Sequence, residues 1–155
     1  MPTKNHFRVV ESATLSWPPA FHIPSSRFRL FVAADVTGVT TDIISEFVHG
    51  ALKRGMVYFC AWGPDCERFH DVVDKVLVED DLGERQFVGP NPTDVIMTTW
   101  HKDDTLDEAS NYFINFASPT DGFQADSDSW IALCVNNPEW AASIRQKIEA
   151  AESPK

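Results

Sequence analysis

The sequence is short of basic residues, long apolar runs and cysteines, and each shortage excludes a class of protein. Among 155 residues, 13 Lys and Arg stand against 23 Asp and Glu, a formal charge of -10 that opposes binding to nucleic acid and anionic membranes. No apolar run approaches the roughly 20 residues that span a bilayer, and residues 1–12 lack the apolar stretch of a signal peptide. We therefore expect a cytoplasmic protein that binds neither nucleic acid nor membranes.

Motifs for nucleotide, hydrolase and metal chemistry are also missing. The stretch 37–41 has one glycine and no lysine, so it fits neither the phosphate loop nor the dinucleotide fingerprint, and no Gly-x-Ser-x-Gly elbow occurs. Cys60, Cys66 and Cys134 are too few and too scattered for a disulfide framework, and the spacing of Cys60, Cys66 and His70 matches no common zinc pattern. We expect a reducing compartment, no metal and no cofactor.

What the chain does contain is four apolar runs, each followed by an amphipathic stretch. The expected strands are residues 29–34, 56–62, 94–99 and 130–135. Such nearly continuous apolar runs are typical of strands covered on both faces, and strands that alternate with helices favour a parallel sheet. The pattern predicts a three-layer α/β sandwich with a mostly parallel four-stranded sheet, either flavodoxin-like or Rossmann-like.

Each expected helix has its own start signal. Thr40 and Thr41 are N-cap candidates, Asp65 can cap the second helix, Thr105 and Glu108 form a capping box, and residues 137–139 read Asn-Pro-Glu. These signals define one domain over residues 27–151. Residues 1–26 are an N-terminal arm that either adds an edge strand near residues 7–10 or wraps the surface, and residues 152–155 are a disordered tail.

The negative charge is concentrated in the middle of the chain. Residues 65–108 hold 13 acidic and 4 basic residues, so this segment carries -9 of the net charge of -10. In the common flavodoxin-like strand order 2-1-3-4, the second and third helices cover the same face of the sheet. That order predicts one acidic face beside the ligand-binding edge.

Ligands of open α/β sheets bind beyond the carboxyl ends of the strands. The residues at those positions are Asp35, Thr37, Gly38, residues 62–66, residues 98–101, Asn136 and Asn137. Among them, Trp62 and Trp100 are expected at the rim, where an aromatic pair could hold a planar ligand or a partner loop. Thr99 is a candidate to face the same cleft.

Cys66 has two readings. As the first residue of a helix, its thiol pKa would be lowered by the helix dipole, and His70 and Asp74 follow at intervals of four residues. If the protein is an enzyme, Cys66 is the nucleophile and His70 or His101 the base. Alternatively, Cys66 shares a helical face with Phe69 and is buried as a small hydrophobic residue.

Three functions compete on these observations. The leading hypothesis is a non-enzymatic acidic module that binds a basic protein partner, as a regulator or immunity-type inhibitor does. Its expected binding residues are Trp62, Asp65, Asp74, Thr99, Trp100, Asp103 and Asp107. The alternatives are a cysteine-dependent hydrolase or transferase, and a small-molecule sensor that uses the cleft between Trp62 and Trp100.

The densest stretch also carries a family resemblance. Residues 62–71, which read Trp-Gly-Pro-Asp-Cys-Glu-Arg-Phe-His-Asp, are followed at a distance by Thr-Thr-Trp-His at 98–101. Together they resemble a family of small bacterial proteins described only as a domain of unknown function. The resemblance implies a bacterial cytosolic origin, and it assigns no activity and no residue roles.

Overall fold

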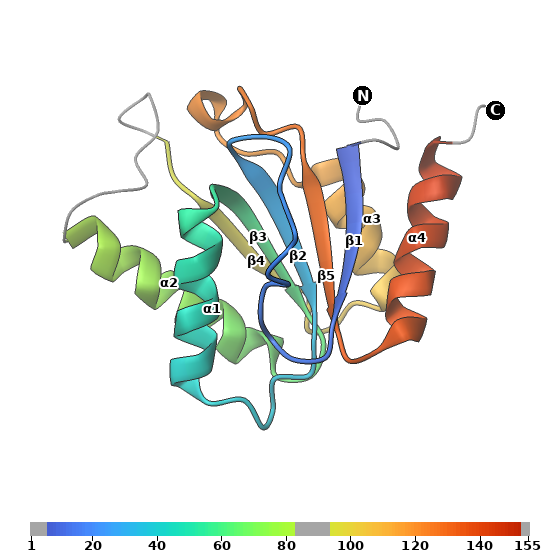
Figure 1. Ribbon diagram of the computed structural model, residues 1–155, viewed down its shortest axis with the longest axis horizontal. Coiled ribbons are helices and arrows are strands. Elements are labelled where there is room, and N and C mark those ends of the chain that lie inside the picture. Colours follow the sequence, from blue (N-terminus) through green and yellow to red (C-terminus); the bar gives the residue numbers. More distant parts are fainter. Residues whose placement is uncertain (1–5, 83–93, 153–155) are drawn as a thin grey trace.

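The computed structural model describes residues 6–82 and 94–152, which form an α/β domain (Figure 1). Its strands are β1 (Phe7–Ser12), β2 (Phe28–Ala33), β3 (Met56–Trp62), β4 (Met97–Trp100) and β5 (Trp130–Val135). Its helices are α1 (Thr41–Lys53), α2 (Cys66–Leu82), α3 (Leu106–Phe116) and α4 (Pro138–Glu152), with a short 3-10 turn at Asp121–Phe123.

The strands form a single parallel sheet in the order β1-β5-β2-β3-β4. Four strands, β2 to β5, are each followed by a helix, and when they are numbered 1 to 4 along the chain their order in the sheet is the 3-2-1-4 of Rossmann folds. β1 is an added edge strand. Helices α1 and α2 pack on one face, and α3 and α4 on the other (Figure 1). The predicted sandwich and its extra N-terminal edge strand are confirmed.

The prediction of one acidic face, which assumed the order 2-1-3-4, is wrong. The chain steps from β2 to β3 to β4 in one direction, so right-handed crossovers place α1 and α2 on the same face. It then returns past β2 to β5, and α3 crosses on the opposite face. The acidic residues of α2 and those of α3 are therefore separated by the sheet.

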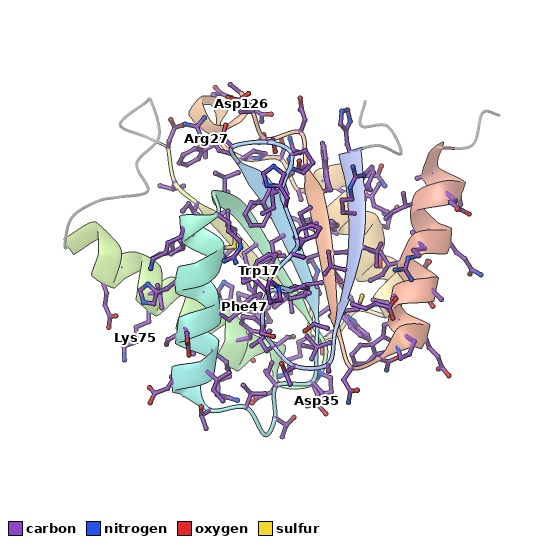
Figure 2. The ribbon with its side chains drawn as sticks, in the orientation of Figure 1. Trp17, Arg27, Asp35, Phe47, Lys75 and Asp126 are labelled. Carbon is purple, nitrogen blue, oxygen red and sulfur yellow. The ribbon has the colours of Figure 1, made fainter. Side chains whose placement is uncertain are left out.

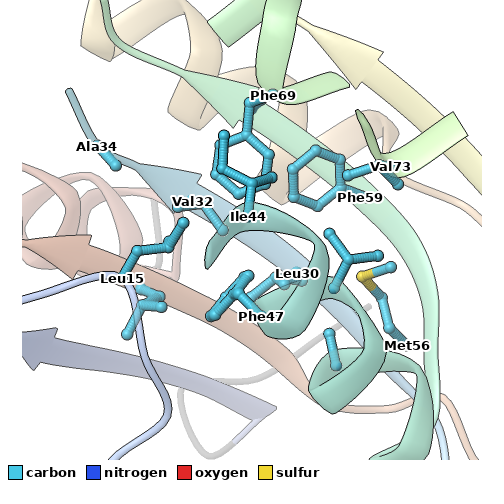
Figure 3. Packing of buried hydrophobic residues seen from close by; sticks show 14 of the residues in the cluster. Leu15, Leu30, Val32, Ala34, Ile44, Phe47, Met56, Phe59, Phe69 and Val73 are labelled. Atoms are coloured by element: carbon cyan, nitrogen blue, oxygen red, sulfur yellow. The ribbon is translucent and has the colours of Figure 1, made fainter. Parts of the chain in front are cut away.

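Strand β2 is buried along its whole length. Leu30 and Val32 pack against the layer of α1 and α2 (Figure 3), whereas Phe31 and Ala33 pack against the layer of α3 and α4. This two-sided burial explains why the strand reads as a nearly continuous apolar run in the sequence.

The N-terminal arm supplies part of the α1 layer. After β1, residues 13–27 cross from the edge of the sheet to β2, and Leu15 is buried in the core on that side. The Trp17 ring stacks on Phe47 of α1, with 5.3 Å between ring centroids and an interplanar angle of 5° (Figure 2). The arm both adds an edge strand and wraps the surface.

The local start signals are confirmed at three helices. The Thr40 hydroxyl accepts a hydrogen bond from Ile43 N, Thr105 and Glu108 form the capping box, and Asn137 Oδ1 accepts from Trp140 N. Helix α4 extends through Glu152, one residue beyond the expected domain boundary. The rest of the expected tail, residues 153–155, lies outside the described residues.

Strand β4 begins later than predicted, at Met97 instead of residue 94. The Asp94 carboxylate is the reason, because Asp94 Oδ1 accepts hydrogen bonds from Thr120 Oγ1 and Gly122 N, each at 2.9 Å. These contacts hold Asp94 against the segment after α3. In the described ranges, no helix has the length and apolar character needed to cross a bilayer.

The turn after β3 generates a stability prediction. Gly63 has φ 118°, and a Cβ atom there would collide with the Ala34 carbonyl, whereas a Cβ on Gly38 would meet open space. We expect Gly63→Ala to lower the free energy of unfolding by at least about 2 kcal/mol, while Gly38→Ala changes it by less than about 0.5 kcal/mol. Urea denaturation of both variants measures the difference, and equal effects would contradict this account.

Candidate functional site

The strand order changes direction between β2 and β5, so their carboxyl ends form the switch point at which open α/β sheets bind ligands. A cleft of about 890 Å³ lies there. Its walls come from the loops after β1, β2, β3 and β5 and from the first turns of α1 and α4. The lining residues are Ala13, Thr14, Leu15, Asp35, Thr37, Gly38, Val39, Ile43, Pro64, Val135, Asn136, Asn137 and Trp140.

Asp35 supplies the negative charge of this switch-point cleft. It lies two residues beyond the end of β2 and is exposed at the lower end of the molecule in Figure 2. Its Oδ1 accepts a hydrogen bond from Thr37 N at 3.0 Å. Hydrogen bonds from the Thr37 side chain and backbone lower the pKa of Asp35, so the group is an anion at neutral pH.

Asn136 and Asn137 form the wall after β5. Asn136 has φ 50°, a left-handed conformation that Asn tolerates better than most residues, and its N–H donates to Ser12 O at 2.7 Å. Asn137 caps α4, as predicted from the Asn-Pro-Glu signal. The two residues thus turn the chain sharply at the mouth of the cleft, so that α4 begins beside it.

Trp140 is the aromatic wall, and Trp62 supports it from behind. The two rings meet edge to face, with 5.0 Å between centroids. Trp62 is itself held by a hydrogen bond from Nε1 to Asp104 O at 2.9 Å. Trp62 therefore positions a residue of the cleft without lining it.

Arg68 of α2 ties down the loop between β2 and α1. Its Nη2 donates to Val36 O at 2.6 Å and to Val39 O at 2.8 Å, while its Nε pairs with Asp65 Oδ2 at 2.7 Å. Asp65 lies directly before the helix, where the cap was expected, but it has φ 65° and only its carbonyl accepts a helical hydrogen bond, from Phe69 N. The carboxylate of Asp65 is thus used to orient Arg68.

Cys66 begins α2 as predicted, but its surroundings correspond to the buried alternative. The residue is 2% exposed and belongs to the apolar cluster with Phe69 and Val73. Burial raises the pKa of the Cys66 thiol, and hydrogen bonds from nearby backbone amides, including that of His101, offset this only in part. The expected lowering of this pKa by the helix dipole is wrong because desolvation is the larger effect.

His70 is held in the packing between α2 and β4. Its Nε2 lies 3.0 Å from Thr98 Oγ1, and the same hydroxyl donates to Asp74 Oδ1 at 2.7 Å. The Trp100 ring lies over the imidazole, with 4.4 Å between centroids. Asp74 and Trp100 are thus partners of one buried histidine on the α2 side of the sheet.

His101 occupies the opposite face. Its Nε2 lies 2.9 Å from Thr99 Oγ1, its Nδ1 lies 2.9 Å from Asp104 Oδ2, and its ring packs on Tyr112. Since Thr98 and Thr99 are adjacent in β4, their side chains point to opposite faces. The imidazoles of His70 and His101 therefore lie on different sides of the sheet, and the structure does not bring them together with Cys66 in one pocket.

The remaining predicted binding residues are also dispersed. Trp62 packs towards α4 and Trp100 towards α2, so they do not form a facing pair. Asp103 is exposed in the loop after β4, and Asp107 pairs with Lys147 of α4 at 3.1 Å. Across residues 6–82 and 94–152, no group of three His, Cys, Asp or Glu side chains is arranged to hold a metal ion.

The cleft is instead built from positions that the strand-end rule selects, namely Asp35, Thr37, Gly38, Asn136 and Asn137. Sequence reasoning gave them less weight because the richest chemistry lay elsewhere along the chain. Leu15 of the arm, Ile43 and Trp140 were missed as lining residues. No local signal marks Leu15, because the crossing of the arm above β5 depends on strand order.

The fold and the switch-point cleft define a Rossmann-like three-layer α/β domain with an added edge strand. The chain belongs to the family described as "Domain of unknown function (DUF7684)", whose model matches residues 8–151. This confirms the resemblance seen in the sequence to a domain of unknown function. Neither the curated proteins nor the solved structures contain a match to the chain.

The raised pKa of Cys66 yields a reactivity prediction. A buried thiol with a raised pKa holds little thiolate, so we expect alkylation by iodoacetamide at about pH 8 to be at least about tenfold slower than that of glutathione. Mass spectrometry of native protein follows the modification, and Cys66→Ala assigns it. In denaturant all three cysteines should react quickly.

The same shift has a consequence for stability. The unfolded thiol ionises first, so the contribution of Cys66 is intact below its unfolded pKa of about 8.5 and is lost as the pH rises above it. Cys66→Ala should therefore flatten the alkaline decline in the free energy of unfolding.

The reactivity prediction fails if Cys66 in the native protein is alkylated faster than glutathione, and that result would favour Cys66 as a nucleophile.

Proposed function

We propose that this domain binds a neutral or cationic small molecule in the switch-point cleft. The observation that carries the proposal is the cleft of about 890 Å³ between the carboxyl ends of β2 and β5. Its volume lies within the range of small-molecule sites, and its position is the one that open α/β sheets use for ligands. The site thus replaces the cleft between Trp62 and Trp100 in the sensor hypothesis.

The charges around the cleft favour the ligand class. Its described lining residues contain the Asp35 carboxylate and no Lys or Arg. Asp42 and Glu139 lie in the first turns of α1 and α4, where they oppose the positive ends of the helix dipoles. A phosphate or carboxylate ligand would meet repulsion here.

The apolar side chains indicate the rest of the ligand. Ile43 is 47% exposed although it is large and apolar, and it lines the cleft together with Val39 and Trp140. These side chains can cover a hydrocarbon or aromatic portion, while Asp35 and the Asn136 side chain bind hydroxyl or ammonium groups. The combination supports an amine or polyhydroxyl compound with an apolar part.

Ligand-induced thermal stabilisation tests this function. A panel of aromatic and aliphatic amines, nucleosides and matched carboxylates is added to the full chain, and the melting temperature is recorded. We expect amines or nucleosides to raise it, with about 2.7 kcal/mol of stabilisation at a hundredfold excess over Kd. Asp35→Asn should remove the response to amines, whereas Glu46→Gln, an exposed change on α1, should keep it.

Two results would oppose the proposal. One is stabilisation by anionic nucleotides that is equal in the wild type and in Asp35→Asn. The other is binding whose amide chemical-shift changes in NMR fall outside the loops after β2 and β5.

We also propose that the exposed side of α2 binds a basic protein segment, because an exposed aromatic ring there adjoins acidic side chains. Trp100 is 45% exposed against His70, which lies between Asp71 and Asp74. Aromatic residues are enriched at protein interfaces, and charges that complement those of the partner add selectivity. The hypothesis of a basic protein partner is thus kept for the α2 face of the sheet only.

Charge reversal on the two faces separates a local surface from a general effect of charge. Asp71→Lys on α2 and Asp107→Lys on α3 change the net charge equally. We expect Asp71→Lys to weaken binding of a lysine-rich peptide by about threefold or more, and Asp107→Lys to have little effect. Fluorescence anisotropy at low salt measures both, and equal losses would show that only net charge matters.

A further inference from the structure

A buried cation lies at the other end of the sheet from the switch-point cleft. Arg29 is the second residue of β2 and is 8% exposed. Its guanidinium carbon lies 3.9 Å from the centroid of the Trp130 ring, so the group is stacked on an aromatic face. Arg29 interrupts an otherwise apolar strand, and burial of a charge is costly unless something compensates it.

The hydrogen-bond partners of the Arg29 side chain are neutral. Its Nη1 donates to Ala117 O at 2.8 Å, its Nε to Ser127 O at 3.3 Å, and its Nη2 to Ser127 Oγ at 3.5 Å. A guanidinium has five N–H donors, so two are left for another acceptor. Burial lowers the pKa of Arg29 and the charge of Asp128 raises it to a smaller extent. No carboxylate of the described residues forms an ion pair with this group.

The guanidinium faces a cleft of about 330 Å³ at the amino ends of β2 and β5. Ile114, Ala117 and Trp130 provide its apolar wall, and Ser118 and Gln124 provide polar groups. Trp130 Nε1 is buried without a hydrogen-bond partner among the described residues. Guanidinium donors that lack an acceptor, beside an open volume, indicate a ligand that accepts hydrogen bonds.

We propose that this amino-edge cleft binds a small monocarboxylate with a short apolar group. A carboxylate accepts two parallel hydrogen bonds from an arginine fork and neutralises the buried charge. The Asp128 carboxylate at the same cleft disfavours ligands with two negative charges, such as phosphate at neutral pH. The apolar wall and the modest volume suit a few carbon atoms.

Paired ligands that differ only in charge test the proposal. Butyrate, its neutral analogue butyramide, and inorganic phosphate are titrated into the full chain, and the tryptophan indole N–H signals are followed by NMR. We expect butyrate to shift the Trp130 signal saturably, assigned with a Trp130→Phe variant, and butyramide and phosphate to leave it unchanged. The melting temperature should rise with butyrate and should not change with butyramide or phosphate.

Two variants sharpen the result. Asp128→Asn removes a repulsive charge and should tighten butyrate binding by about three- to fivefold. Arg29→Lys keeps the charge without the fork and should weaken binding by about tenfold. Asp35→Asn, at the opposite end of β2, is the matched control and should leave the affinity for butyrate unchanged.

Several outcomes would overturn the proposal. They are an equal response to butyrate and butyramide, a response to phosphate that matches that to butyrate, an Asp128→Asn affinity equal to that of the wild type, or no shift of the Trp130 signal at saturating butyrate. If Arg29→Lys fails to fold, Asp128→Asn and the ligand pair still decide the matter. The proposal does not depend on the switch-point cleft, and either site can fail alone.

Discussion

The structure depends on covering both faces of β2. This strand lies between β3 and β5, and every residue of it is buried. A parallel strand in the middle of a sheet needs apolar cover above and below, which α1 with the N-terminal arm provides on one side and α3 with α4 on the other. The reversal of strand order next to β2 follows from dividing the helices between the two faces, and that reversal opens the switch-point cleft.

The two proposed small-molecule sites lie at opposite ends of this strand and have opposite charge. Asp35 follows the carboxyl end, where first-turn acids reduce the field of the helix termini. Arg29 lies at the amino end, where its cost of burial is offset in part by stacking on Trp130. The second residue of this buried strand thus places a guanidinium at one cleft, and the loop after the strand places a carboxylate at the other, so the two proposed sites carry opposite charge.

The histidines show why residue spacing was a poor guide to the site. Steps of four residues predicted that Cys66, His70 and Asp74 share one helix flank, and His101 was correctly expected at the end of a strand. Because the side chains of Thr98 and Thr99 point to opposite faces of β4, the two histidines that contact these hydroxyls lie on different faces. Each imidazole lies between a strand hydroxyl and a carboxylate, and among the described residues no hydrogen bond joins either imidazole to the Cys66 thiol.

Local patterns were sufficient for much of the fold. Apolar runs located β2, β3 and β5 to within a residue, and the signals at Thr40, Thr105 and Asn137 located helix starts, because these features depend on neighbours within a few positions. The late start of β4 was not predictable, since it depends on a bond from Asp94 to residues more than twenty positions away. The order of the strands, and with it the pairing of Asp35 with Asn136 in one cleft and the separation of the acidic helices, arose only in three dimensions. Strand order is chosen by how the layers bury one another, and no local stretch of residues encodes that choice.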